Sequence, residues 1–362
     1  MLTTSPAWRT RLPRRWTGRV QVADDAAMMP LRNRDGTPAV IRDQANRAWL
    51  DGERARLRAE LDRTDAGHSP TGSHRPPRWK SRAVRLRAKL QALDGLHTSL
   101  DRYGDTYLIA LDASRRNVKA ILSHGNPETA DHVVVSVPGM GAQVDFACTV
   151  DGMARETSWL REEATAQLQR VGRDDESVAA VAWIWYDTPP WQAPAALRGR
   201  AFRAAPELAK YLRAVRRTSV NPGLHLTLVG HSYGSLVAGL ALHDGASTVV
   251  DDYVAYGSAG FYARDEAALG MERGHVFVML APDDPIRFPA RLGLFGGDPA
   301  VGAFRQLSTA AATTPDGVRR VGACGHAGYP RSFSRDGRDM LFTTGFNTAV
   351  VAAGLAELAV SL

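Results

Sequence analysis

The sequence predicts an α/β protein in which an N-terminal helical hairpin precedes a mostly parallel, doubly wound sheet of about eight strands. Apolar strands alternate with amphipathic helices after residue 104, and a glycine-bracketed turn at Ser232 joins a buried strand directly to a helix. Such alternation requires crossover connections, which are right-handed and place helices on both faces of a parallel sheet. We therefore predict a poorly ordered basic arm (1–35), a helical region (36–103) and one large α/β domain (104–362).

The basic charge lies in the N-terminal part of the chain. Residues 1–100 contain 20 Lys and Arg against 10 Asp and Glu, whereas the whole chain carries a formal charge of only +7. Neither a recognition motif nor interleaved aromatic residues accompany these arginines, so we interpret them as a solvated helical surface and expect no nucleic-acid partner.

Targeting and membrane signals are weak. The first twenty residues contain no continuous apolar core of the kind a signal peptide needs. The most apolar terminal stretch, Phe346–Leu362, is interrupted by Glu357 and is too short to cross a bilayer, so it predicts a helix packed on the sheet. We expect a cytoplasmic protein with no integral membrane segment.

Two amphipathic patterns predict the N-terminal hairpin. One runs from Pro38 to about Arg63 and the other from Ser81 to about Leu100, with apolar residues at helical spacing. The linker between them contains His68 and His74, and no carboxylate or thiol cluster accompanies these residues. We interpret both as exposed loop histidines.

The two cysteines do not indicate a metal site or a disulfide framework. Cys148 and Cys324 lie far apart in the chain and show no metal-ligand spacing. We expect reduced thiols, no metal and no cofactor.

From Asp105 onward the pattern is one of strands. T-Y-L-I-A-L-D and V-K-A-I-L-S predict an antiparallel hairpin, and the continuous apolar runs that follow predict strands buried on both faces. These runs are His132–Val137, Val178–Trp185, Leu224–Val229, Val250–Tyr256, His275–Leu280 and a short stretch near Phe304–Leu307. Helices are expected at about Met153–Arg170, around Leu208–Val215 and directly after Ser232. An antiparallel start, a parallel sheet and a serine turn after the fifth strand form the α/β-hydrolase arrangement.

The turn G-H-S-Y-G presents Ser232 as a candidate nucleophile. A strand that meets a helix so abruptly holds the residue at the apex in a strained conformation, and the flanking Gly230 and Gly234 avoid a steric collision. The alternative is a tight packing turn with an inert serine.

A serine hydroxyl needs a base, and the base needs an orienting acid. In this fold the chain order is serine, acid, histidine. His326 follows the last sheet strand in A-C-G-H-A-G-Y, and A-P-D-D-P-I offers Asp283 and Asp284 at the end of an earlier strand. We favour Asp284, keep Asp283 as the alternative acid, and note that one of them could cap the turn.

Two backbone amides are needed to bind a developing oxyanion. The amide of Tyr233 directly follows the candidate nucleophile, and P-G-M-G after the third strand lets the backbone approach a substrate closely. Met140 is therefore the second candidate donor. The alternative is a glycine turn with no role in catalysis.

Several blocks of the chain, in one order, resemble a bacterial family of α/β-hydrolases catalogued as domain of unknown function 1023. The resemblance begins near Ile41 and is carried by R-D-Q-A-N-R, T-A-D-H-V-V-V-S-V-P-G-M-G, A-W-I-W-Y-D, V-G-H-S-Y-G-S, A-P-D-D-P-I and G-H-A-G-Y. It implies the fold and a serine hydrolase triad with Asp284 at the acidic position. Members also occur beside small secreted helical proteins, which keeps unconventional export open.

These observations favour a serine hydrolase that cleaves a small-molecule ester or thioester through an acyl-enzyme. Two alternatives stay open: a non-catalytic binding protein whose partner docks on the N-terminal helices, and an acyltransferase. We expect the hairpin or the segment from Phe288 to Asp316 to cover the substrate pocket.

Overall fold

The computed structural model describes residues 31–34, 36–66, 78–114, 117–141, 147–188, 197–335 and 337–362. The described residues do not include most of the predicted basic arm, His68, His74 or the side chain of Cys148. The strands of the main sheet are β1 (Thr106–Asp112), β2 (Lys119–His124), β3 (His132–Val137), β4 (Val178–Ile184), β5 (His225–His231), β6 (Asp252–Tyr256), β7 (Val276–Met279) and β8 (Arg305–Gln306).

The sheet order is β1-β2-β4-β3-β5-β6-β7-β8. β1, β2 and β4 pair antiparallel, and every later pair in the order is parallel. β5 lies centrally, so the turn at its carboxyl end opens between β3 and β6. The predicted fold class is confirmed.

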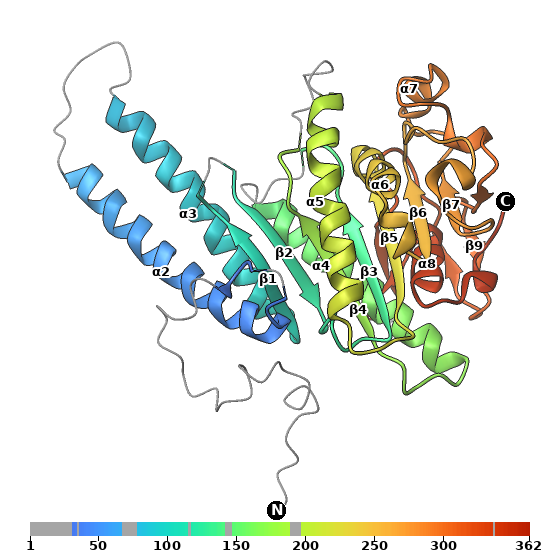
Figure 1. Ribbon diagram of the computed structural model, residues 1–362, viewed down its shortest axis with the longest axis horizontal. Helices are drawn as coiled ribbons and strands as arrows, with labels where there is room; N and C mark the ends of the chain where they lie inside the picture. The colour runs from blue at the N-terminus through green and yellow to red at the C-terminus, as the bar shows by residue number, and fades with distance from the viewer. Residues whose placement is uncertain are drawn as a thin grey trace, which may run out of the picture.

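Helices cover both faces of this sheet (Figure 1). Their bounds are α2 (Ala39–Ala66), α3 (Arg78–Arg102), α4 (Ala147–Arg170), α5 (Leu197–Thr218), α6 (Tyr233–His243), α7 (Arg287–Arg291) and α8 (Thr343–Ala352). The apolar residues of α5 and α6 share one core cluster with the sheet, and those of α4 and α8 share another. α2 and α3 pack against each other beside β1 and β2.

The predicted hairpin α2–α3 closes the border of the sheet at β1. The Asp43 carboxylate accepts a hydrogen bond from the Leu108 N–H at 2.7 Å, and the buried Asn46 amide donates to the Leu108 carbonyl at 3.0 Å. Asn33 both donates to the Leu111 carbonyl and accepts from its N–H. The side chains of Asn33 and of α2 thus take the place of a missing neighbouring strand, because a backbone at a sheet border otherwise keeps unpaired groups.

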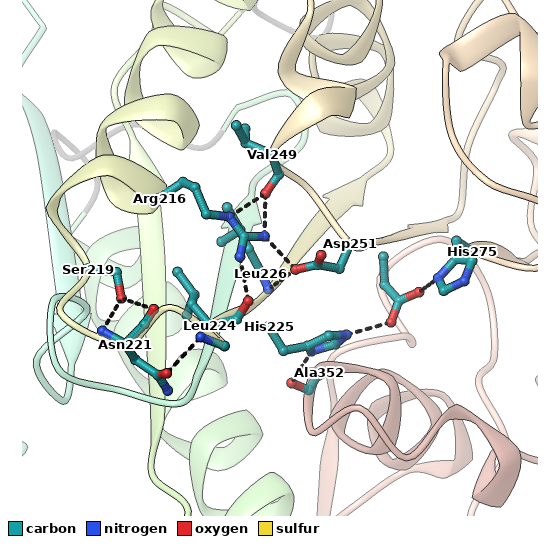
Figure 2. Close-up of polar contacts among 12 residues, drawn as sticks. Arg216, Ser219, Asn221, Leu224, His225, Leu226, Val249, Asp251, His275 and Ala352 are labelled. Atoms are coloured by element: carbon teal, nitrogen blue, oxygen red, sulfur yellow. Dashed lines mark hydrogen bonds and ion pairs between the residues drawn. The ribbon is translucent and has the colours of Figure 1, made fainter.

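A polar network ties the amino ends of the central strands (Figure 2). His225 and His275 contact the two oxygens of the buried Asp252 carboxylate at 2.9 and 2.8 Å, and Arg216 pairs with Asp251 at 2.6 Å. Because Ser232 follows the carboxyl end of β5, these histidines lie at the opposite end of the strands. They hold the sheet together and take no part in the candidate site.

The C-terminal part differs from the prediction. The helix expected over Phe346–Leu362 begins at Thr343 and ends at Ala352, because Gly354 adopts a positive φ of 65° and its N–H bonds back to the Val351 carbonyl. Two small sheets were not expected. They pair β9 (Ala312–Thr313) with β10 (Arg319–Arg320), and β11 (Ser332–Arg335) with β12 (Arg338–Leu341).

Arg320 joins the smaller of these sheets to the main body. Its fully buried guanidinium pairs with Glu163 of α4 and with Asp316, each at 2.7 Å, and donates to the Leu341 carbonyl at 3.0 Å. The segment between β10 and β11 carries His326, so this ion-paired anchor fixes one end of the loop that bears it.

Candidate active site

Ser232 occupies a strained turn between β5 and α6. Its φ of 52° and ψ of −123° are unusual for a residue other than glycine. A Cβ on Gly230 would lie 2.5 Å from the Ser235 Cα, and one on Gly234 would lie 2.2 Å from the Val137 carbonyl oxygen. Only glycine fits at these two positions, so the local sequence dictates the sharp turn that was predicted.

His326 lies against Ser232. The distance from His326 Nε2 to Ser232 Oγ is 2.7 Å, and His326 Nδ1 is 3.0 Å from each carboxylate oxygen of Asp284. Since a carboxylate can only accept, Nδ1 carries the proton and Nε2 is the acceptor for the serine hydroxyl. The three side chains predicted to act together are in direct contact.

Asp283 and Asp284 have different partners. Asp283 is exposed and accepts hydrogen bonds from the Cys324 thiol at 3.0 Å and from the Gly325 N–H at 2.9 Å. Asp284 is buried, contacts His326 and also accepts from the Ile286 N–H at 2.8 Å. Asp284 therefore meets the imidazole, whereas Asp283 holds the loop that carries it.

Tyr329 is a member of the site that the sequence analysis missed. Its hydroxyl donates to Asp284 Oδ2 at 2.7 Å and accepts from the Ala281 N–H at 2.9 Å. Burial alone would raise the pKa of Asp284, but hydrogen bonds from His326, Tyr329 and Ile286 outweigh it and hold that pKa below its usual range. Asp284 is thus kept ionised. In the sequence, Tyr329 was visible only as the last residue of the block G-H-A-G-Y.

His231, next to Ser232, supports the same loop. Its Nε2 donates to the His326 carbonyl at 3.1 Å, and its ring stacks on Tyr256 with centroids 5.2 Å apart. Burial, followed by the nearby His326, lowers the pKa of His231 to about 4. The imidazole is therefore neutral at pH 7 and acts as a fixed donor.

The loop after β3 passes directly over Ser232. A Cβ on Gly139 would lie 3.0 Å from the Ser232 Cβ, so glycine permits this close approach. Met140 follows and lines the pocket. The buried Tyr186 hydroxyl donates to the Pro138 carbonyl and fixes the loop, another contact that the sequence analysis missed. Tyr233 begins α6, where the helix dipole places partial positive charge.

A cavity of about 540 Å³ opens beside Ser232 and His326. Its walls come from the loop after β3, from α4, from the segment that carries His326 and from α8. No described residue of the α2–α3 hairpin or of the segment from Phe288 to Asp316 lines this cavity, so within the described residues neither expected cover reaches this pocket. The apolar wall residues include Val137, Met153, Leu160 and Leu341.

The described residues give no sign of a metal centre or of a membrane-spanning helix. Across these segments no three His, Cys, Asp or Glu side chains gather in a way that could hold an ion. None of the described helices combines the length and apolar character that crossing a bilayer requires.

Comparison with known proteins gives a family match and uncharacterized relatives. A family model described as alpha/beta hydrolase matches residues 113–294, half of the chain. An uncharacterized protein of Mycobacterium tuberculosis strain H37Rv is 33% identical over 232 residues, which cover 63% of this chain and 86% of that protein. A second uncharacterized protein of that strain is 30% identical over 199 residues, covering 51% of this chain and 28% of the relative.

The solved structures that match this chain include a cutinase and an esterase. A Trichoderma reesei cutinase in complex with a phosphonate inhibitor shares 11% identity at a TM-score of 0.34, covering 84% of this chain and 96% of its own. An esterase of Pyrobaculum calidifontis shares 15% identity at a TM-score of 0.37, covering 76% of this chain and 93% of its own.

Proposed function

The chain belongs to the alpha/beta hydrolase family, and from that premise we propose that it is a serine hydrolase of carboxylic esters or thioesters. The observation that carries the proposal is the continuous chain of contacts from Ser232 through His326 to Asp284. A hydroxyl, an imidazole and a carboxylate so linked are the groups that acyl transfer to serine requires.

In the proposed reaction, Ser232 Oγ attacks the carbonyl carbon of the substrate while His326 Nε2 takes the hydroxyl proton. Asp284 holds Nδ1–H and stabilises the imidazolium that forms. The proton then passes to the leaving alcohol or thiol, and an acyl-enzyme on Ser232 remains. Water then attacks the acyl-enzyme while His326 Nε2 takes its proton, and that proton returns to Ser232 Oγ as the bond to the acyl group breaks and the acid leaves.

We assign the oxyanion site to the backbone amides of Met140 and Tyr233. The close approach of Gly139 to Ser232 and the position of Tyr233 at the start of α6 support this assignment. Donors at these two points would face the oxygen on which charge builds up in the tetrahedral intermediate.

The finer family assignment is also a proposal. The blocks that resemble domain of unknown function 1023 include R-D-Q-A-N-R, whose Asp43 and Asn46 bind the backbone of β1, and G-H-A-G-Y, which carries His326 and Tyr329. These contacts give the shared residues a structural reason, and they support the resemblance.

A non-catalytic binding role through the N-terminal helices is less well supported. The apolar residues of α2 and α3, among them Leu50, Leu57, Leu93 and Leu96, are buried against β1 and β2. A protein partner would meet the charged outer surface of the hairpin instead.

The test is hydrolysis of p-nitrophenyl esters of graded chain length by wild type and Ser232→Ala. In Ser232→Ala we expect kcat/KM to fall by at least about a thousand-fold, because His326 and Asp284 cannot act without the nucleophile. Ser334→Ala, in the exposed part of β11, is the matched control and should keep full activity. A fluorophosphonate should label Ser232 in wild type. Equal rates for wild type and Ser232→Ala would overturn the proposal.

A further inference from the structure

The pocket beside Ser232 contains an acidic side chain that the proposed mechanism does not use. Glu156 lies on α4 and lines the cavity together with Met153, Leu160 and Ser232. Within the described part of the chain, its carboxyl group forms neither a hydrogen bond nor an ion pair. A carboxyl group therefore faces the substrate space without a protein partner of its own.

The surroundings of Glu156 make this arrangement costly. Burial raises the pKa of Glu156 to about 7, and the positive charges of Arg331 and Arg155 offset this effect only in part. Glu156 is half-buried, and its carboxyl group faces the cavity without a hydrogen-bond donor from the described residues. A carboxyl group partly removed from water binds a donor more strongly than an exposed one does, and a ligand in the cavity can supply that donor.

The charges around Glu156 restrict the chemistry of that ligand. A partner of the Glu156 carboxylate must donate a hydrogen bond, which an anionic oxygen cannot do, and a cationic donor would be repelled by Arg155 and Arg331, which also line the pocket. A neutral hydroxyl suits both, because it donates to the carboxylate and keeps lone pairs for a guanidinium. The apolar walls are left for the carbon skeleton.

We propose that Glu156 binds a hydroxyl group of the substrate, so that the natural substrates are hydroxylated esters rather than plain alkyl esters. This inference rests on the proposed function and names the substrate class of the same site. A site that hydrogen-bonds a substrate hydroxyl strongly rejects the analogue that lacks it, because its own buried polar group is then left unpaired. Glu156 is thus a specificity-determining residue.

Two matched pairs of esters test the inference. On the acyl side, p-nitrophenyl 3-hydroxybutyrate is compared with p-nitrophenyl butyrate. On the alcohol side, glyceryl monobutyrate is compared with propyl butyrate. Wild type should show kcat/KM at least about tenfold higher for the hydroxylated member of one pair. In Glu156→Leu the ratio of the two kcat/KM values should fall to about one. Glu156→Gln keeps an acceptor oxygen, so its ratio should lie between those of wild type and Glu156→Leu.

Controls separate this inference from the proposed function. Glu162→Leu changes an exposed acidic residue on the same helix and should keep the wild-type ratio. Thermal unfolding at pH 8 should show that Glu156→Gln is at least as stable as wild type, since it removes a half-buried charge. Ester turnover and fluorophosphonate labelling of Ser232 without any preference for the hydroxyl would overturn only the inference, as would a preference that survives Glu156→Leu. Absence of both turnover and labelling would overturn the proposed function.

Discussion

Tyr329 is the residue whose contribution to the site is easiest to isolate. Its hydroxyl is buried between the Asp284 carboxylate and the Ala281 N–H, so it links the end of β7 to the loop that carries His326. We regard it as a positioning residue, because it touches Asp284 and acts on His326 only through that carboxylate.

We predict that Tyr329→Phe lowers the free energy of unfolding at pH 7 by about 1.5–3 kcal/mol, the range for a hydrogen bond to a charged group. The pKa of Asp284 is depressed in the folded protein, so its stabilising contribution is present above the unfolded carboxyl pKa and is lost as pH falls through the folded value. The hydroxyl supplies part of that depression. The difference in the free energy of unfolding between Tyr329→Phe and wild type should therefore be smaller at about pH 3 than at pH 7.

Urea unfolding at the two pH values measures this difference. Tyr262→Phe, which removes a tyrosine hydroxyl outside the site, is the control and should change stability by less than about 0.5 kcal/mol. An unfolding difference for Tyr329→Phe that is equal at pH 7 and pH 3 would contradict the assigned role of Asp284.

The candidate site was predictable only where local geometry or chain order carries the signal. G-x-S-x-G requires a tight turn, so Gly230 and Gly234 identify Ser232 from the sequence. Tyr329 and Glu156 gave no such signal, because each matters through its surroundings in the folded chain. Tyr329 donates a hydrogen bond to Asp284, and Glu156 lines the pocket without a hydrogen-bond partner among the described residues.

At the scale of elements, prediction succeeded where a pattern runs through several residues. The continuous apolar runs of β3 and β4 and the amphipathic stretches of α2 and α3 were found with small errors at their ends. β9 and β10 are two residues each, too short for any periodicity. The end of α8 depends on the single residue Gly354, whose place after the helix was overlooked.

We predict that Arg320→Ala destabilises the protein by about 3–5 kcal/mol, because it leaves the carboxylates of Glu163 and Asp316 buried without their partner. Arg320→Lys should recover only part of the loss, since an ammonium group cannot reproduce the several directed bonds of the guanidinium.

Chemical unfolding measures both variants. Arg319→Ala is the matched control, since Arg319 is the exposed neighbour in β10 and should contribute little. If Arg320→Ala were as stable as Arg319→Ala, the anchor between β10 and α4 would have no energetic role.

At the scale of the whole molecule, the helical region and the sheet share one core. Leu50, Leu57 and Leu93 of the hairpin pack in the same cluster as Leu108 of β1 and Leu122 of β2. The predicted division at residue 103 stays a prediction, and this shared cluster argues that 104–362 does not fold alone.

We predict that a chain beginning at residue 104 is insoluble or aggregated, because it exposes both this apolar surface and the backbone of β1. A chain beginning at Leu31 keeps the whole described hairpin and serves as the control. Size-exclusion chromatography and circular dichroism compare the two. A monomeric, cooperatively unfolding chain that begins at residue 104 would show instead that residues 104–362 form an independent domain.

The hydrogen bonds from Asp43, Asn46 and Asn33 to β1 also bear on how copies of this chain can associate. Peptides and neighbouring molecules often bind a sheet by adding a strand to it, which requires unsatisfied amides and carbonyls along a border. Here the N–H and carbonyl groups of Leu108 and Leu111 already form hydrogen bonds with side chains. A partner that binds at β1 must therefore recognise side-chain shape and charge, because these backbone groups are not free to pair with an added strand.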